Sequence, residues 1–451
     1  MKAVNTSRRA FLKFAGSTAA GAMVAACGLA TTQVPPPATP APASTSGESV
    51  ELRIAWWGSQ NRTTRTLDVI KLFEKEHPNI KISPEYASYD DYFTKLTTQA
   101  AGKSLPDLIQ QDYPYIAEWV SRDLLLPLDD YVSNGSLNLK GVSESALSGG
   151  RLNGKLFALD LGTNAQAFVF DPELFQKAGV EIPKPGWTWT DLEETATRIH
   201  EKLNIYGVSS GLYAPEKFAV WLRSNGATLY NKEGTALGYE DDKLFVDWMN
   251  MMLRLMKAGV IPTREFDTSR GDASVEQDLI VTKESAMSAI YSNQLVALSV
   301  AGGNRSLQIG LYPGAGADKP DGLFINPSMF FSISAQAKHP AEAAMFMDFF
   351  TNSLDANKVL EAERGVPISP TIRDALSPTL GGPQKQTFDY ISLVEQHSTP
   401  IDPPDPPSAG DVLSNNFNPI VEQVLYGKIT PEDGAKQFRE QANAVLVKNT
   451  K

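Results

Sequence analysis

"VELRIAWWG", residues 50–58, has the composition of a buried β-strand and is followed by the pattern of an amphipathic helix. Leu67, Ile70 and Phe73 recur at helical spacing, and the His77-Pro78 pair ends that helix. A second strand ("NIKISPEY", 79–86), a second helix ("DDYFTKLTTQAAG", 90–102) and a third strand ("PDLIQQD", 106–112) come next. This alternation predicts an α/β fold with a parallel, doubly wound sheet.

The chain after residue 50 is too long for a single core. About 400 residues remain there, whereas one hydrophobic core usually serves no more than ~250–300. In "LFALDLGTNAQAFVFDPELF" (156–175), Gly162-Thr163-Asn164 interrupts two apolar runs, which predicts a crossing between two lobes. The following region is mostly helical, and Thr190 with Glu193 is the expected capping box of a helix over 189–203. Later strands are expected at "KESAMSAIYS" (283–292) and "FFSIS" (330–334).

The N-terminus has the features of an export signal. Residues 7–13 fit the twin-arginine pattern S-R-R-x-F-L-K, with the pair at Arg8 and Arg9, and no acidic residue precedes Cys27. The apolar stretch that follows is shorter than the ~20 residues of a membrane span. "VAAC", ending at Cys27, resembles a bacterial lipobox. We therefore interpret 1–26 as a twin-arginine lipoprotein signal peptide; the alternative is an ordinary signal with an incidental cysteine.

Cys27 is the only cysteine in the sequence, and if lipidation consumes its thiol, neither a disulfide nor a thiolate metal site is possible. We expect it to carry lipid and to hold the protein on the outer face of the cytoplasmic membrane. Residues 27–49 include "TTQVPPPATPAPASTSGES", which has almost no large apolar side chain and is typical of an extended spacer. Residues 27–49 are thus the expected lipidated cysteine and tether.

Charge and composition exclude several classes of partner. Without the four basic residues of the signal, 37 Lys and Arg face 52 Asp and Glu, a net charge of −15. Such a balance opposes nucleic acids and anionic lipid surfaces, which attract basic proteins. The four histidines form no H-x-x-x-H pair, so we expect no zinc site, and we predict no cofactor.

Two features of the sequence are compatible with a catalytic site. "GVSSG" (207–211) fits the G-x-S-x-G elbow around Ser209, and His339 or His397 could complete a triad. The elbow requires a helix directly after the serine, whereas the helical pattern here starts at least four residues late. Glycosidase carboxylates could also come from distant positions. A lipid-anchored extracellular hydrolase acting on glycosides or esters therefore remains the alternative function.

The carboxyl edge of the first sheet gathers side chains suited to a sugar. Successive strand residues face opposite ways, so either Trp56 or Trp57 is expected in the core and the other over this edge, where open α/β sheets bind ligands. Aromatic plates together with amides, carboxylates and guanidinium groups match the apolar faces and polar rims of sugar rings. The candidate residues at this edge are Trp57, Gln60, Asn61, Arg62, Asp112 and Tyr113.

From Val50 to Lys451 the chain resembles the extracellular solute-binding proteins of family 1, the maltodextrin-binding type of bacterial ABC transporter receptor. The order of the matching stretches carries the resemblance: "LRIAWWGSQN…VIKLFEKEHPNIKI", "PDLIQQD…LLLPLDDYV", "GKLFALDLGTNAQAFVFDPELFQKAGV…WTWTDLEE", "KESAMSAIYS", "FFSIS…KHPAEAAMFMDFF", "RGVPIS" and "ITPEDGAKQFREQANAVL".

The resemblance implies a periplasmic-binding-protein-like α/β fold, with two doubly wound lobes joined by several crossing strands around a ligand cleft. Lobe 1 would span about 50–163 and 325–364, and lobe 2 about 164–324 and 365–451. The implied function is binding of a carbohydrate, an oligosaccharide in our interpretation, and its delivery by a monomeric, non-enzymatic receptor to membrane permease subunits. By position, the resemblance adds these ligand-binding candidates to the edge residues: Asn164, Tyr213, Trp221, Tyr291, Asn293, Phe330 and Arg364.

Overall fold

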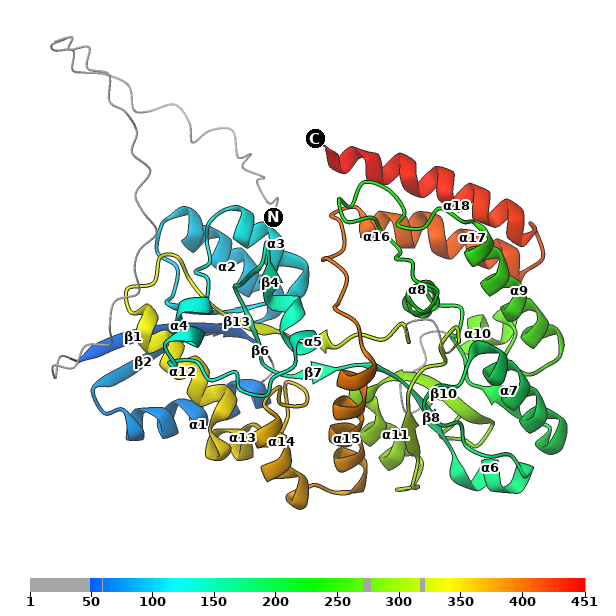
Figure 1. Ribbon diagram of the computed structural model, residues 1–451, viewed down its shortest axis with the longest axis horizontal. Helices are drawn as coiled ribbons and strands as arrows, with labels where there is room; N and C mark the ends of the chain where they lie inside the picture. The colour runs from blue at the N-terminus through cyan, green and yellow to red at the C-terminus, as the bar shows by residue number, and fades with distance from the viewer. Residues whose placement is uncertain (1–48, 59, 271–276, 317–320, 451) are drawn as a thin grey trace, which may run out of the picture. The chain divides into compact units, whose positions relative to one another are not determined.

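The computed structural model describes residues 49–58, 60–270, 277–316 and 321–450 (Figure 1). The predicted export signal at Arg8 and Arg9 and the predicted lipidation site at Cys27 lie outside these residues.

The first sheet contains the strand predicted at residues 50–58. Its order is β2 (Ile80–Ala87), β1 (Val50–Trp57), β3 (Leu108–Gln111), β13 (Phe330–Ile333) and β6 (Leu159–Asp160). β1 runs parallel to β2 and β3, which confirms the predicted parallel alternation. β13 is antiparallel to both β3 and β6, so a strand from late in the sequence completes this sheet.

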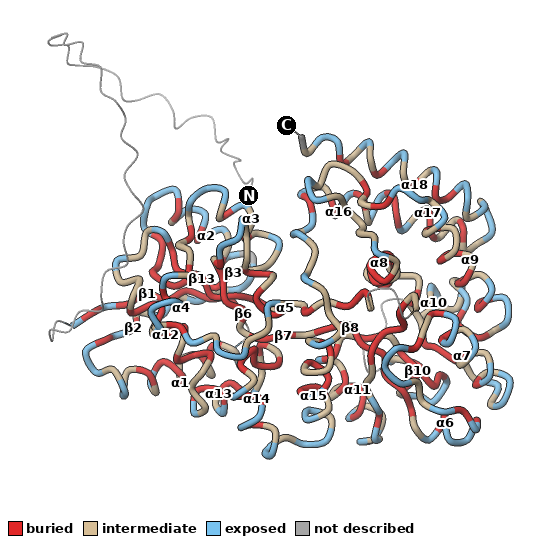
Figure 2. Tube along the Cα trace, in the orientation of Figure 1, coloured by how far each residue is buried: buried red, intermediate tan, exposed pale blue. Residues whose placement is uncertain are grey.

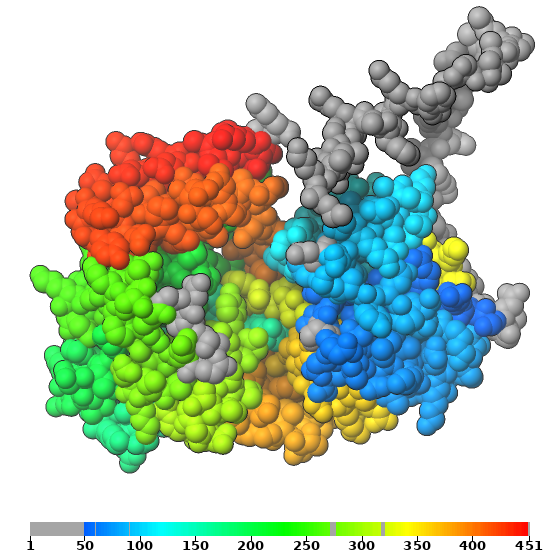
Figure 3. All heavy atoms as spheres, turned by 180° about the vertical axis from the view of Figure 1, so that it is seen from behind, coloured from blue at the N-terminus to red at the C-terminus, as the bar shows by residue number. Residues whose placement is uncertain are grey.

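Alternation along β1 divides the core of this lobe, lobe 1, into two layers. Ile54 and Trp56 face a layer that includes Phe73 of α1 (Gln60–Glu76) and Phe346 of α12 (Pro340–Asn352). Ala55 and Trp57 face the opposite layer, under α2 (Tyr89–Ala101) and α3 (Tyr113–Ser121). Figure 3 shows the late segment that contains α12, in yellow, against the blue N-terminal residues. The remaining elements here are α4 (Asp129–Ser133), α5 (Glu144–Leu147), β4 (Arg151–Leu152), β5 (Lys155–Leu156) and α13 (Leu354–Leu360).

A second sheet organises lobe 2, in the order β11 (Gln308–Gly310), β8 (Gln166–Phe170), β10 (Ser285–Tyr291) and β9 (Tyr206–Val208). β8 and β10 are almost entirely buried, as the red tube in Figure 2 shows. The helices of this lobe are α6 (Pro172–Ala178), α7 (Trp189–Leu203), α8 (Pro215–Ser224), α9 (Lys243–Lys257), α10 (Arg264–Arg270), α11 (Leu295–Ala301), α14 (Pro370–Leu376), α15 (Gly382–His397), α16 (Ala409–Asp411), α17 (Asn418–Leu425) and α18 (Pro431–Leu446).

Three chain segments cross between the lobes and lie side by side. β7 (Thr163–Asn164) pairs antiparallel with β12 (Asn326–Pro327), and Thr163 also forms a β-bridge with Val366. At Gly162 a Cβ atom would lie 2.3 Å from the carbonyl oxygen of Arg364, so only glycine allows this approach of the two backbones. The expected interruption at residues 162–164 is therefore a strand crossing.

The start of α7 differs from its expected capping box. Thr188 is the N-cap: its hydroxyl accepts from the Asp191 backbone N–H, and the Asp191 carboxylate accepts from the Thr188 backbone N–H, whereas these roles were expected of Thr190 and Glu193. The S/T-x-x-acid spacing occurs twice in succession here, and burial of Trp189 places the helix start at the first of them.

None of the described helices combines the length and the apolar character that a membrane crossing requires.

Candidate functional site

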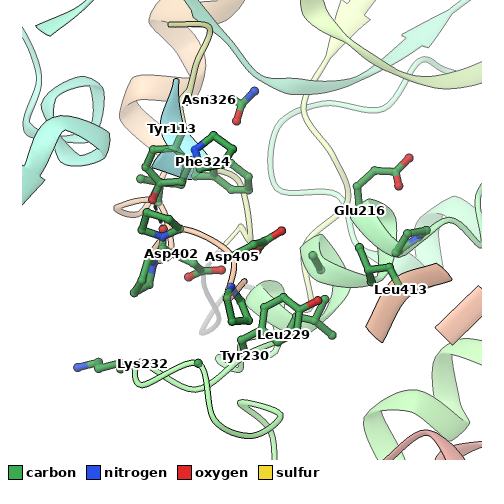
Figure 4. A pocket seen from close by; sticks show the side chains of 18 of the residues that line it. Tyr113, Glu216, Leu229, Tyr230, Lys232, Phe324, Asn326, Asp402, Asp405 and Leu413 are labelled. Carbon is green, nitrogen blue, oxygen red and sulfur yellow. Dashed lines mark hydrogen bonds between the residues drawn. The ribbon is translucent and has the colours of Figure 1, made fainter. Parts of the chain in front are cut away.

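A pocket of about 300 Å³ lies where lobe 1, lobe 2 and the residues that follow α15 meet (Figure 4). Tyr113 and Pro114 line it from lobe 1, Asn326 from the crossing strands, and Gln166 and Glu216 from lobe 2. Its volume is at the small end of the ~300–1,000 Å³ range of ligand pockets. Its aromatic lining consists of Tyr113, Tyr230, Tyr291 and Phe324.

Tyr113 is held by the end of β3. Asp112, directly after that strand, is the N-cap of α3 and accepts a 2.8 Å hydrogen bond from the Tyr113 backbone N–H. The Tyr89 hydroxyl donates to the other Asp112 oxygen at 2.7 Å. Burial raises the pKa of Tyr113, so its hydroxyl stays protonated and donates to the backbone carbonyl of Asp402.

Residues 399–406, "TPIDPPDP", form one wall of the pocket, and we call them the strap. Arg223, in the last turn of α8, fixes the strap to lobe 2. Its buried guanidinium donates to the Pro400 carbonyl at 2.9 Å, to the Thr399 hydroxyl and to the Asp402 carboxylate, with which it forms an ion pair. On the side of lobe 1, the Ile401 N–H donates to the Ser148 hydroxyl at 3.3 Å. The strap therefore contacts both lobes.

Lys217 lies behind the opposite wall. Its ammonium group is 5.5 Å from the centre of the Tyr291 ring and 3.7 Å from the Glu216 carboxylate, and it donates to the Gln166 side-chain oxygen at 3.4 Å. Burial lowers the pKa of Lys217, and burial also raises the pKa of Tyr291 to about 12. This wall is thus an aromatic surface backed by an internal cation.

Among the residues predicted from the sequence, the structure brings Tyr113 and Tyr291 together in the pocket. Two others lie next to it. Asp112 positions Tyr113 as described, and Asn164 is paired in register with the lining residue Asn326. The Asn164 side-chain oxygen is buried without a hydrogen-bond partner in the part of the chain that the structure describes.

The polar residues at the start of α1 belong to lobe 1 and do not line the pocket. Gln60 and Asn61 are exposed and bond within the helix, to Thr64 and Arg65. The Arg62 guanidinium forms an ion pair with Glu363 at 3.0 Å.

Arg364 is also outside the pocket. It is 4% exposed and donates to the Thr66 hydroxyl at 2.9 Å. Burial, with the nearby Arg62 charge, lowers the pKa of Arg364 to about 9. In this structure Arg364 therefore joins the segment before Val366 to helix α1.

Neither Trp56 nor Trp57 is the expected open ring over the sheet edge, because both are buried. Trp57 packs among Tyr89, Tyr92 and Phe93 with ring centres 5.3–5.4 Å apart. Phe330 is fully buried too. Alternation placed the two tryptophans on opposite faces as expected, but helices cover both faces.

The remaining candidates lie elsewhere on lobe 2. The Tyr213 hydroxyl donates to Asp267 of α10 at 2.8 Å. Trp221 lines a separate surface hollow together with Trp189 and Arg254. Asn293 is exposed in a short 3-10 helix after β10.

The features of the hydrolase alternative are not assembled around Ser209. This serine is 2% exposed, and its backbone N–H donates to the Met287 carbonyl within the second sheet. The His397 ring bonds to Asp321, and the backbone N–H of His339, the N-cap residue of α12, donates to Asp107. The helix after the elbow begins only at Pro215.

The strap, Glu216, Tyr230 and Phe324 line the pocket but were not predicted from the sequence. The strap could have been predicted from its sequence, because a proline-rich stretch such as "TPIDPPDPP" favours an extended segment without a hydrogen-bonded ladder. Two aspartates interrupt its prolines. No sequence pattern indicates Glu216 and Tyr230, because the topology of lobe 2 alone determines which of its helix and loop residues face lobe 1.

Residues 59–353 match the family of bacterial extracellular solute-binding proteins. The chain belongs to this family. A family 1 extracellular solute-binding protein of Alicyclobacillus acidocaldarius has the same fold, with a TM-score of 0.81 and 32% identity over 89% of this chain and 100% of that one. A periplasmic oligogalacturonide-binding protein of Yersinia enterocolitica gives 0.74 and 26%, with 89% and 100% covered.

Among curated proteins, a putative binding protein of Brucella abortus is 30% identical over 177 residues, which cover 38% of this chain and 41% of that protein. The chain thus matches less than half the length of this curated relative. The family membership and the structural matches over 89% of this chain together confirm the predicted fold class and the predicted resemblance.

Proposed function

We propose that this protein is the extracytoplasmic receptor of an ABC importer, and that it captures a carbohydrate, an oligosaccharide in our interpretation, in the pocket beside the strap. The observation that carries the proposal is the lining itself. Tyrosine and phenylalanine rings stand next to carboxylate and amide groups, as the apolar faces and hydroxyl rims of a sugar require. The oligogalacturonide-binding neighbour with the same fold supports a saccharide ligand.

A thermal-shift screen against mono- and oligosaccharides tests this function. A ligand present at 100 times its dissociation constant adds ~2.7 kcal/mol to the free energy of unfolding, which gives a clear rise in melting temperature. We expect a subset of saccharides to raise it. If no saccharide in a broad panel does so while amino acids or peptides do, the carbohydrate proposal is wrong.

We further propose that Cys27 carries the lipid that holds the receptor on the outer face of the cytoplasmic membrane, and that the receptor is a monomer. The support is the sequence pattern of residues 7–13 and 24–27. Cys27→Ala is expected to leave the protein exported but released from membranes. Equal membrane fractionation of this variant and its parent would contradict the anchor.

A further inference from the structure

The pocket has an uneven distribution of charge. Its described lining residues include the three acids Glu216, Asp402 and Asp405 and a single basic residue, Lys232. Lys232 is exposed, and in Figure 4 its side chain extends away from the three carboxyl groups. Three carboxyl groups and one ammonium group therefore line the pocket, and the ammonium group extends away from the other three.

Two of these acids are compensated by cations that lie behind the lining. Asp402 forms an ion pair with Arg223, and Glu216 lies 3.7 Å from the ammonium group of Lys217. Asp405 differs from them, since the described part of the chain supplies it with neither an ion pair nor a hydrogen bond. Asp405 is exposed at the surface of the strap, although the surrounding residues partly desolvate its carboxyl group. Asp405 is thus an available hydrogen-bond acceptor.

The two buried cations behind the pocket lining, Arg223 and Lys217, are already engaged by protein groups. The Arg223 guanidinium donates to the Gly322 carbonyl at 3.0 Å in addition to its three acceptors on the strap, and it stacks 4.9 Å from the Phe324 ring. Lys217 is buried behind Tyr291. No planar guanidinium fork is left free among the described lining residues to take a ligand carboxylate, the group that arginine recognises best.

The wall near Asp405 contains a second unmet group. The Tyr230 hydroxyl is buried without a hydrogen-bond partner among the described residues, and the Asp405 charge contributes to raising its pKa. A buried hydroxyl without a partner calls for an explanation, and a nearby ligand hydroxyl can provide one, because hydroxyls both donate and accept.

We infer that this site takes a saccharide without acidic groups, and that Asp405 accepts a hydrogen bond from one of its hydroxyls. The inference rests on the proposed function and narrows its substrate class. A uronate would place its own carboxylate beside Asp402 and Asp405, where Arg223 and Lys217 are already engaged by protein groups and the Lys232 side chain extends away, whereas a hydroxyl or an amine at the same position is attracted. A preference for saccharides without acidic groups distinguishes the chain from its oligogalacturonide-binding neighbour.

The test uses matched pairs of saccharides that differ only in the oxidation of C6, such as galactose oligomers against galacturonate oligomers and glucose oligomers against glucuronate oligomers. Isothermal titration of the whole protein at pH 7 gives the affinities. We expect the neutral member of any bound pair to bind at least tenfold more tightly. Equal or tighter binding of the acidic member overturns the inference and leaves carbohydrate binding intact. Failure of all members to bind overturns the proposed function as well.

Asp405→Asn tests the role of the carboxylate while keeping the shape of the side chain. We expect the affinity for the neutral saccharide to fall about tenfold or more, because hydrogen bonds to charged groups are the strong ones. Asp374→Asn, an exposed aspartate on α14, is the matched control and should change nothing. Melting curves identify any variant that has lost its fold. Unchanged affinity in folded Asp405→Asn overturns this role.

The pH profile of the unmodified protein provides a readout that needs no variant. Partial burial, with the Asp402 charge, raises the pKa of Asp405. The ionised form is the acceptor, so affinity should rise as pH rises through that pKa. Asp402, paired with Arg223, and the tyrosines Tyr113 and Tyr230 are the other titratable groups near it. Affinity that stays constant from pH 3 to pH 7 contradicts the assignment.

Discussion

Replacing Trp57 with alanine is expected to lower the free energy of unfolding by about 3–5 kcal/mol, the usual cost of removing a buried tryptophan. The ring is 7% exposed and fills the space between Tyr89, Tyr92 and Phe93. Urea denaturation measures the change, and Trp57→Phe, which leaves a smaller cavity, should lose less. Near-wild-type stability combined with weaker saccharide binding would instead restore Trp57 as a ligand contact.

Asp160 gives a pH-dependent contribution to stability. It is buried, and burial raises its pKa well above the ordinary value, although the Gly162 backbone N–H donates to it at 3.1 Å. The folded protein therefore holds this proton at pH values where the unfolded chain, with a pKa of about 3.9, has released it. The contribution of Asp160 to the free energy of unfolding is therefore fully present below the pKa of the unfolded chain. It is lost as pH rises toward the pKa of Asp160 in the folded protein.

We accordingly expect Asp160→Asn to be relatively more stable at pH 7 than at pH 4, when each is compared with the parent protein at the same pH. Urea denaturation of the variant and the parent protein at pH 4 and at pH 7 measures the difference in their free energies of unfolding at each pH. Glu85, whose pKa is lowered in the folded protein, changes stability with pH in the opposite direction. It is present in both proteins, so its contribution cancels in the comparison. A difference that does not change with pH would show that Asp160 is ionised in the folded protein.

At the scale of single residues, the sequence predicts which types of side chain suit the site better than it predicts which groups they contact. Tyr113 was located because it follows a strand of the parallel sheet, and the carboxyl edge of such a sheet is where ligands bind. Trp57 follows the same rule, yet α2 covers its face of the sheet, and no local pattern shows how far a neighbouring helix extends. Arg364, a candidate ligand contact by resemblance, bonds to α1 across 298 residues of sequence, a contact that no local pattern indicates.

At the scale of elements, Arg223 makes the side-chain bonds that join the strap to lobe 2. Arg223→Met keeps the apolar stem but removes the ion pair with Asp402 and the bonds to Thr399 and Pro400. We expect faster hydrogen exchange at Thr399 and Ile401 and weaker saccharide binding, because the wall of the pocket is no longer held.

Arg439→Met is the matched control for the strap. Arg439 likewise pairs with an aspartate, Asp242, and stacks 4.8 Å from an aromatic ring, Tyr239, but it lies outside the pocket lining. Exchange in the strap should be unchanged in this variant. If Arg223→Met exchanges no faster than Arg439→Met at Thr399 and Ile401, the strap is held by other contacts.

Regular elements were the most predictable part of the fold, because each depends on a local period. β1, α1, β2, α2 and β3 were expected in this order and are all present. The pairing of β13 between β3 and β6 was not expected, since the pattern of "FFSIS" shows a strand but contains nothing about its partners. Irregular segments such as the strap have no period, so their place in the site appears only in the folded chain.

At the scale of the whole molecule, we expect the lobes to close on a ligand about the crossings near 162–164, 326–328 and 364–366. Short crossing strands suit a hinge motion, and a ligand drives it only if it binds the closed form more tightly. Small-angle scattering should show a smaller radius of gyration with a saturating saccharide. An unchanged profile at saturation would mean that the lobes do not move.

The central claim is that a saccharide binds in the pocket between Tyr113, Tyr291 and the strap. Calorimetric titration of Tyr291→Ala beside Tyr86→Ala tests it most directly, because Tyr86 is an aromatic residue 53% exposed and outside the pocket lining. We predict that the affinity falls about tenfold or more in Tyr291→Ala, since stacking on an aromatic face is lost, and that Tyr86→Ala binds as the parent does. Full affinity in folded Tyr291→Ala, together with its loss in Trp221→Ala, would contradict the claim and place the ligand in the hollow beside Trp189.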